Sequence, residues 1–188
     1  DKVIEYSGEC QRLGIRVLPP DINVSDGGFT VDGPDIRFGL NAVKNVGRNL
    51  IATTVQERRE MPFRSLYDYC KRLYGVEINR RAVESLIKAG AFDQLEDTRR
   101  GMLESVEGIL KSVETDARKN VAGQLDLFSQ LDDEDEWDDY HIPKVPEYPP
   151  QELLRMEKDV SGLYLSGHPL DSYREKIEQY ATCQILAL

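Results

Sequence analysis

The spacing of apolar residues predicts two short helices that meet at a tight bend near the middle of the first half of the chain. An apolar side chain recurs every three or four positions on each side of the bend, which is the period of a helix with one buried face. These residues are Leu40, Val43 and Val46 before the bend, and Leu50, Ile51 and Val55 after it. Gly47, Arg48 and Asn49 lie between the two runs, so a helix-hairpin-helix is expected here.

Further helices are predicted on both sides of this pair. A helix near the start should end at Gly14, and helical spacing continues through residues 63–74, 81–90 and 98–113. Asn79 is expected to cap the helix that Gly90 ends. In the last part of the chain, a helix should end near Gly162 and be followed by the turn YLSGHPLD and a final helix.

Strands are predicted only between residues 21 and 38, where apolar and polar positions alternate. The alternating apolar residues are Ile22, Val24, Phe29, Val31, Ile36 and Phe38. Two clusters, Asp26-Gly27-Gly28 and Asp32-Gly33-Pro34, divide this stretch into three short strands. A small antiparallel β meander is therefore expected to lead into the hairpin.

The expected fold is mainly α, with this small antiparallel β meander and a body of tandem helix-hairpin-helix-like units. Periodicity fails after Arg118, and residues 119–150 are acidic and end in proline-spaced segments, which indicates a linker. The domain prediction is an N-terminal helix and meander over 1–38, a helix-hairpin-helix helical body over 39–118, the acidic linker over 119–150 and a C-terminal helical segment over 151–188. Because the chain opens at Asp1 without an initiator Met and ends on the apolar run ILAL, we expect it to be a piece of a longer protein.

The bend has the chemistry of a phosphate site. A helix-hairpin-helix leaves the first N–H groups of its second helix unpaired at the positive end of the helix dipole, which suits a phosphate oxygen. Lys44 and Arg48 flank that position. Asn45, Val46 and Gly47 resemble the core of the non-sequence-specific DNA-binding hairpin, in which Asn replaces a usual Gly and can take a positive φ. The expected DNA-binding residues are Lys44, Asn45, Val46, Gly47, Arg48 and Asn49; the alternative is an ordinary αα-hairpin buried in a helical core.

Net charge alone argues against a nucleic-acid partner, since the chain carries −10 at pH 7. The acidity is local, however. Residues 1–119 hold 19 basic and 19 acidic residues, whereas 120–188 hold 5 against 15. Residues 37–81 hold ten basic residues against four acidic ones. This basic block either contacts phosphate or is a solvated helix surface.

A second, degenerate helix-hairpin-helix is predicted around AGAFDQL, between the helices at 81–90 and 98–113. Tandem hairpins would present two phosphate-facing ends along one duplex without reading bases. Structural packing is the favoured role for this second copy.

Large apolar residues stand out within the predicted linker. QLDLF, residues 124–128, resembles the pentapeptide with which bacterial replication and repair proteins bind the sliding clamp. The resemblance implies clamp-binding roles for Gln124, Leu125, Asp126, Leu127 and Phe128. The alternative is an apolar turn that packs back on the helical body.

Other chemistry is not indicated by the sequence. Cys10, Cys70 and Cys183 lack the spacing of a zinc site or a disulfide framework, so reduced, partly buried thiols are expected. His168 lies beside Pro169 in a turn and has no identifiable nucleophile partner, which favours a structural role. No stretch approaches a membrane span, and a cytoplasmic protein without a membrane partner is expected.

Several long segments in the same order resemble the bacterial DNA polymerase III alpha subunit family, in the part after the fingers. These segments are ECQRLGIRVLPPDIN, IRFGLNAVKNVG, NRRAVESLIKAGAFD, GQLDLF and EKDVSGLYLSGHPLD. The resemblance implies a region that binds duplex DNA and the sliding clamp, contacts other domains of the same polymerase and precedes an OB-type domain. The metal-binding aspartates of the palm are expected elsewhere in the parent, so neither catalytic residues nor a cofactor are expected here, although the parent would use Mg²⁺.

Two other functions remain open at this point. A clamp- and DNA-binding accessory region of a repair nuclease or ligase would show structure-selective binding. A pure protein-interaction scaffold would bind the clamp without salt-dependent affinity for DNA.

Overall fold

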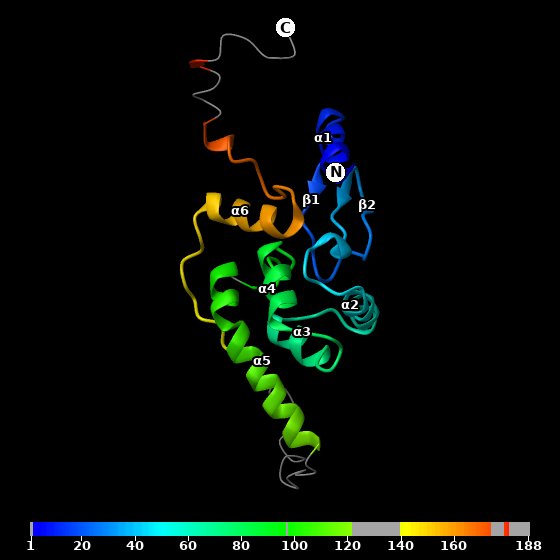
Figure 1. Ribbon diagram of the computed structural model, residues 1–188, viewed down its shortest axis with the longest axis vertical. Helices are drawn as coiled ribbons and strands as arrows, with labels where there is room; N and C mark the ends of the chain where they lie inside the picture. Colours follow the sequence, from blue (N-terminus) through cyan, green and yellow to red (C-terminus); the bar gives the residue numbers. More distant parts are fainter. Residues whose placement is uncertain (1, 97, 122–139, 174–178, 181–188) are drawn as a thin grey trace.

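The computed structural model describes residues 2–96, 98–121, 140–173 and 179–180 (Figure 1). Buried apolar residues of this part form one main core. The α-helices of this part are α1 (Lys2–Arg12), α2 (Arg48–Glu60), α3 (Leu66–Arg72), α4 (Arg80–Lys88), α5 (Arg99–Val121) and α6 (Pro150–Ser161). Two short 3-10 turns are η1 (Leu40–Ala42) and η2 (Asp171–Tyr173). The fold is thus mainly α, as predicted.

The helical body is built from α3, α4 and α5, with α6 lying across α4 (Figure 1). Leu86, Ile87 and Phe92 are fully buried within it, which explains the strong amphipathic pattern of α4. The predicted cap is confirmed, because the Asn79 side chain accepts from the Ala82 N–H at 3.0 Å. Gly90 follows α4 with φ +86°, a left-handed conformation that favours glycine after a helix.

The small sheet differs from the predicted meander. Its strands are β1 (Val17–Leu18), β2 (Thr30–Asp32) and β3 (Asp35–Arg37), in the order β1-β3-β2. β2 pairs antiparallel with β3, as expected, but β1 runs parallel to β3 with Val17 opposite Ile36. The sheet is therefore mixed rather than purely antiparallel.

The predicted strand at Ile22 and Val24 is a turn instead. The Asp21 carboxylate accepts the N–H groups of Asn23 at 2.7 Å and Val24 at 3.2 Å, so this turn supplies its own hydrogen bonds. Ile22 is fully buried and its N–H donates to the Ala91 carbonyl at 2.8 Å. Ile22 is therefore buried from a turn rather than from a strand, whereas Val24 is exposed.

The chain before the bend is also less helical than predicted. Only η1 forms there, and Val43 already has an extended backbone. Leu40 and Val43 are buried, so the apolar spacing again marks a packed face. The first half of the hairpin is therefore a single 3-10 turn, followed by a bend at Val43 and a turn at Lys44 and Asn45.

The predicted linker over 119–150 differs from the structure at both ends. α5 continues to Val121, and residues 140–149 form extended chain that packs along α5 before α6 begins. The Tyr140 ring stacks on Tyr67 with centroids 6.3 Å apart. A Cβ at Gly108 would collide with the Tyr140 hydroxyl, so the helix leaves room for this ring through a glycine. The acidic run at 132–139 and the QLDLF motif lie outside the described residues.

Candidate nucleic-acid interface

The bend between η1 and α2 is a tight hairpin whose backbone suits the residues present. Asn45 takes φ 64°, the left-handed conformation expected from its place in the motif. Gly47 follows as the N-cap of α2 with φ −70° and ψ 142°, an extended conformation that any residue adopts. Of the two residues at the turn, Asn45 therefore supplies the unusual backbone angle.

The N-terminus of α2 is open toward solvent. Gly47 is the N-cap residue of α2, and among the described residues no side-chain hydrogen bond caps the helix. The first N–H of α2 with a backbone acceptor is that of Ile51, which donates to the Gly47 carbonyl at 3.1 Å. The N–H groups at positions 48–50 are the ones that an α-helix leaves without intrahelical acceptors. Leu50 and Ile51 are each 1% exposed and fix the helix to the core. The result is a rigid helix end whose donors and dipole favour an anion.

Lys44 contributes both a backbone and a side-chain contact to this arrangement. Its N–H donates to the Val160 carbonyl and its ammonium to the Asp159 carbonyl, both at 2.8 Å. The ammonium therefore lies at the C-terminal end of α6, where a cation is favoured by the helix dipole. It remains exposed and keeps two further donors, so it adds positive charge beside the hairpin.

The other face of the hairpin lies against α4. The Asn45 side-chain amide donates to the Ser85 hydroxyl at 3.2 Å. Near the start of α4, a Cβ at Gly47 would lie 3.5 Å from a carboxylate oxygen of Glu77. The hairpin is thus held between α4 and the end of α6. The six predicted DNA-binding residues, Lys44 to Asn49, lie together in this hairpin, and Lys44, Asn45, Gly47, Arg48 and Asn49 are exposed.

Part of the basic block is structural rather than free for a ligand. The Arg58 guanidinium donates to the carbonyls of Ile22 and Ser25, at 3.0 and 2.5 Å, and to the Asp26 carboxylate at 2.7 Å. Burial lowers the pKa of Arg58, partly opposed by the charge of Asp26. Arg72 likewise donates to the Glu57 carbonyl at 2.6 Å. Charge counting along the sequence could not separate such arginines from exposed ones.

The second predicted hairpin is partly buried, and a carboxylate of the protein occupies the start of its second helix. The Glu147 carboxylate accepts the N–H of Arg99 at 2.6 Å and that of Arg100 at 3.2 Å, at the start of α5. This is the position that a phosphate would take in an open hairpin. Gly90 and its neighbours are buried as well. At the start of α5 these N–H groups are therefore used for contacts within the fold.

A buried ion cluster fixes α6 to this second hairpin. The Arg99 side chain, 5% exposed, donates to Asp93 at 2.6 Å and to Glu157 at 3.0 Å. Burial alone would lower the pKa of Arg99, but the hydrogen bond to Asp93 and the charge of Glu157 raise it overall. Glu157 is fully buried and also accepts the N–H groups of Leu165 and Ser166. Sequence reasoning missed this cluster, because no local pattern joins residues so far apart.

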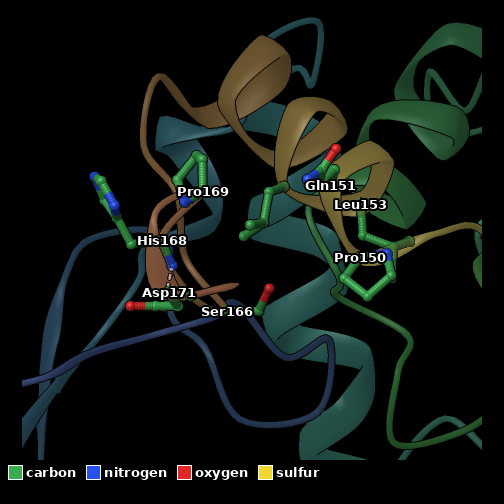
Figure 2. A pocket seen from close by; sticks show the side chains of 9 residues that line it. Pro150, Gln151, Leu153, Ser166, His168, Pro169 and Asp171 are labelled. Carbon is green, nitrogen blue, oxygen red and sulfur yellow. Dashed lines mark hydrogen bonds between the residues drawn. The ribbon is translucent and has the colours of Figure 1, made fainter. Parts of the chain in front are cut away.

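A pocket of about 230 Å³ lies between the start of α6 and the turn at 166–171 (Figure 2). The His168 ring points away from the pocket, and its Nδ1 accepts the Leu170 N–H at 3.2 Å. The Asp171 carboxylate accepts the His168 backbone N–H at 2.7 Å rather than contacting the ring. The His–Asp pair therefore shapes the turn and does not form a catalytic dyad.

Two classes of feature are missing from the part of the chain that the structure places. It holds no group of three His, Cys, Asp or Glu side chains arranged for a metal ion. None of its helices combines the length and the apolar composition of a membrane span.

Comparison with known proteins agrees with the geometry of the hairpin. A family model described as a helix-hairpin-helix motif matches residues 14–102, which include the open hairpin and the start of α5. The match therefore covers both predicted hairpins and the sheet that precedes them.

Curated relatives match the chain from end to end. The chain is 39% identical over 194 residues to the DNA polymerase III subunit alpha of Saccharopolyspora erythraea, with 100% of the chain covered. The proteins of the same name from Escherichia coli and Thermus aquaticus are 37% and 41% identical over 96% and 98% of the chain. The chain spans only 15 to 16% of the length of these relatives. The chain thus contains a helix-hairpin-helix motif and belongs to the bacterial DNA polymerase III alpha subunit family.

Proposed function

We propose that this chain is a noncatalytic region of a replicative DNA polymerase that binds duplex DNA through the open hairpin and the sliding clamp through QLDLF. The DNA proposal rests chiefly on the uncapped N-terminus of α2, with Lys44 and Arg48 exposed beside it. Backbone N–H groups and point charges of this kind contact phosphate oxygens, which are the same for every base sequence. Binding should therefore be independent of sequence.

Nucleotidyl transfer is assigned to other parts of the parent polymerase. A Mg²⁺ site for phosphoryl chemistry needs carboxylates held together on a rigid scaffold. The described residues contain no such cluster, so they do not fit the metal. Positioning of the duplex is the contribution proposed for this region, in a cytoplasmic polymerase.

The hairpin assignment is tested by reversing its charges. A Lys44→Glu, Arg48→Glu variant should bind a labelled duplex at least tenfold more weakly by fluorescence anisotropy. The slope of log K against log[salt] should fall in magnitude by about two, because each phosphate contact contributes about 0.9 to it. Since Lys44 also contacts α6, circular dichroism must show that the variant remains folded. Arg118→Glu at the far end of α5 is the control, because its partner there is Glu114. Equal affinities for the hairpin variant and the control would refute the assignment.

The clamp proposal rests on the motif alone, because residues 124–128 lie outside the described part of the chain. Leu127 and Phe128 are assigned to an apolar pocket of the clamp and Gln124 to a hydrogen bond at its rim. Burial of two such side chains contributes about 2 to 4 kcal/mol, enough to account for much of a roughly micromolar affinity. A Leu127→Ala, Phe128→Ala variant should lose clamp binding in calorimetry, whereas Leu131→Ala, three residues further along, should retain it. Equal clamp affinities of the two variants would exclude the motif as the binding element.

A further inference from the structure

The flank of α4 continues the surface that the open hairpin presents. The hairpin approaches this flank at two points. Just before α4, Glu77 lies near Gly47. Further along α4, the Ser85 hydroxyl accepts from the Asn45 side-chain amide at 3.2 Å. Arg81 lies between these two points in the sequence. It also precedes Ser85 by four residues, which places both residues on one face of the helix. The side chain of Arg81 therefore projects from α4 on the side where the hairpin is seated.

Arg81 differs from its neighbour Arg80 in its partners. Arg80 pairs with Glu84 at 2.6 Å and with Glu107 of α5 at 3.2 Å. These bonds hold Arg80 toward α5, about 100° around the helix axis from Arg81. Arg81 is exposed and forms no ion pair with any residue that the structure places. Within the part of the chain that the structure describes, its positive charge is therefore not compensated by an ion pair.

We propose that Arg81 is a further phosphate-binding residue, which extends the hairpin contact along the DNA backbone. This inference rests on the proposed function and names an additional contact of the same surface. An exposed guanidinium without a carboxylate partner binds phosphate well, since its planar donors match two phosphate oxygens. Lys44, Arg48 and Arg81 then form one cationic strip, with Glu77 as the acid at its edge.

The inference also assigns a different role to the second helix pair. The start of α5 is closed by Glu147, so its N–H groups are not available to DNA. The flank of α4, in contrast, is exposed at Arg81 and adjoins the open hairpin. The second pair therefore contributes to DNA binding through a helix side chain rather than through a second hairpin.

Arg80 and Arg81 provide a matched pair of variants for the test. Arg81→Gln should weaken binding of a labelled duplex about three- to tenfold and lower the magnitude of the salt slope by about one. Arg80→Gln removes the same charge from the adjacent position and should leave the salt slope unchanged. Arg81→Lys should restore most of the slope, because it restores the charge.

The outcomes distinguish this inference from the function on which it rests. If Lys44→Glu, Arg48→Glu weakens binding while Arg81→Gln matches Arg80→Gln, the hairpin binds DNA and the role of Arg81 is refuted. If neither the hairpin variant nor Arg81→Gln changes affinity, the proposed function itself fails. A loss specific to Arg81→Gln in a protein that melts like the parent supports the inference.

Discussion

Removal of Arg99 should be among the most damaging single changes in this protein, and a second substitution should partly repair it. Arg99 is 5% exposed and lies 3.0 Å from the carboxylate of Glu157, which is fully buried. In Arg99→Leu that carboxylate keeps two backbone donors but loses its only ion-pair partner among the described residues. An uncompensated buried charge typically costs about 3 to 5 kcal/mol.

The second substitution, Glu157→Gln, removes the buried negative charge that Arg99→Leu leaves without an ion-pair partner. The amide oxygen of Gln can still accept from the N–H groups of Leu165 and Ser166, and Asp93, 37% exposed, can be solvated. The remaining cost is an unpaired amide donor, about 1 to 3 kcal/mol. The double variant should therefore be more stable than Arg99→Leu alone.

Urea denaturation followed by circular dichroism measures these differences as changes in the free energy of unfolding. Arg100→Leu is the control, since Arg100 pairs with Glu104 at the surface. Its loss should lower the free energy of unfolding by less than about 1 kcal/mol. Additive losses in the double variant would show that the two groups are not coupled, and the reasoning about the buried pair would be wrong.

Three further predictions concern other parts of the molecule. Gly101→Ala should destabilise the fold by about 1 to 3 kcal/mol, because the new Cβ would meet the Pro143 carbonyl at 2.6 Å. Gly8→Ala, with open space around it, should not destabilise the fold. Equal melting temperatures of the two variants would contradict packing of 140–149 on α5. Glu77→Gln should tighten duplex binding a few-fold at low salt, measured by anisotropy, because it removes the acid nearest Gly47. Burial raises the pKa of Cys70 to about 12 from 9.0, so the unfolded thiol ionises first and stability falls as pH rises. By pH 10 the parent should have lost roughly 1 kcal/mol more of its free energy of unfolding than Cys70→Ala, measured by urea denaturation, and parallel pH profiles would refute the shift.

The sequence was most informative where local rules determine structure. The cap at Asn79, the glycine ends of the helices and the positive φ of Asn45 all depend on a few adjacent residues. The segments α2 to α5 were predicted for the same reason, since the apolar period identifies a buried face without knowledge of what covers it. The open hairpin was therefore located to within a few residues: its turn lies at Lys44 and Asn45, and α2 begins at Arg48 rather than after Asn49.

Features that depend on distant residues were not predictable in this way. The parallel pairing of β1 with β3 requires the chain to pass through the turn around Asp21 and return, and no local signal marks the return. The sequence of residues 140–149 predicts a linker, because its apolar side chains are few and lack a helical period. Their partner surface on α5 depends on Gly101 and Gly108, which look unfavourable within a helix until the packed segment is known.

The two hairpins differ in whether the fold itself supplies an acceptor at the N-terminus of the second helix. Both place the N-terminus of a helix behind a turn, and both ends favour negative charge. At α5 the fold supplies that charge itself through Glu147, which satisfies the donors and anchors the segment leading to α6. At α2 no described side chain caps the helix, while Lys44 ties the hairpin to the end of α6. The chain between Glu147 and Val160 thus occupies the start of α5 and also braces the hairpin before α2. Under the proposed function, the position of α6 should therefore govern how rigidly this hairpin meets a phosphate.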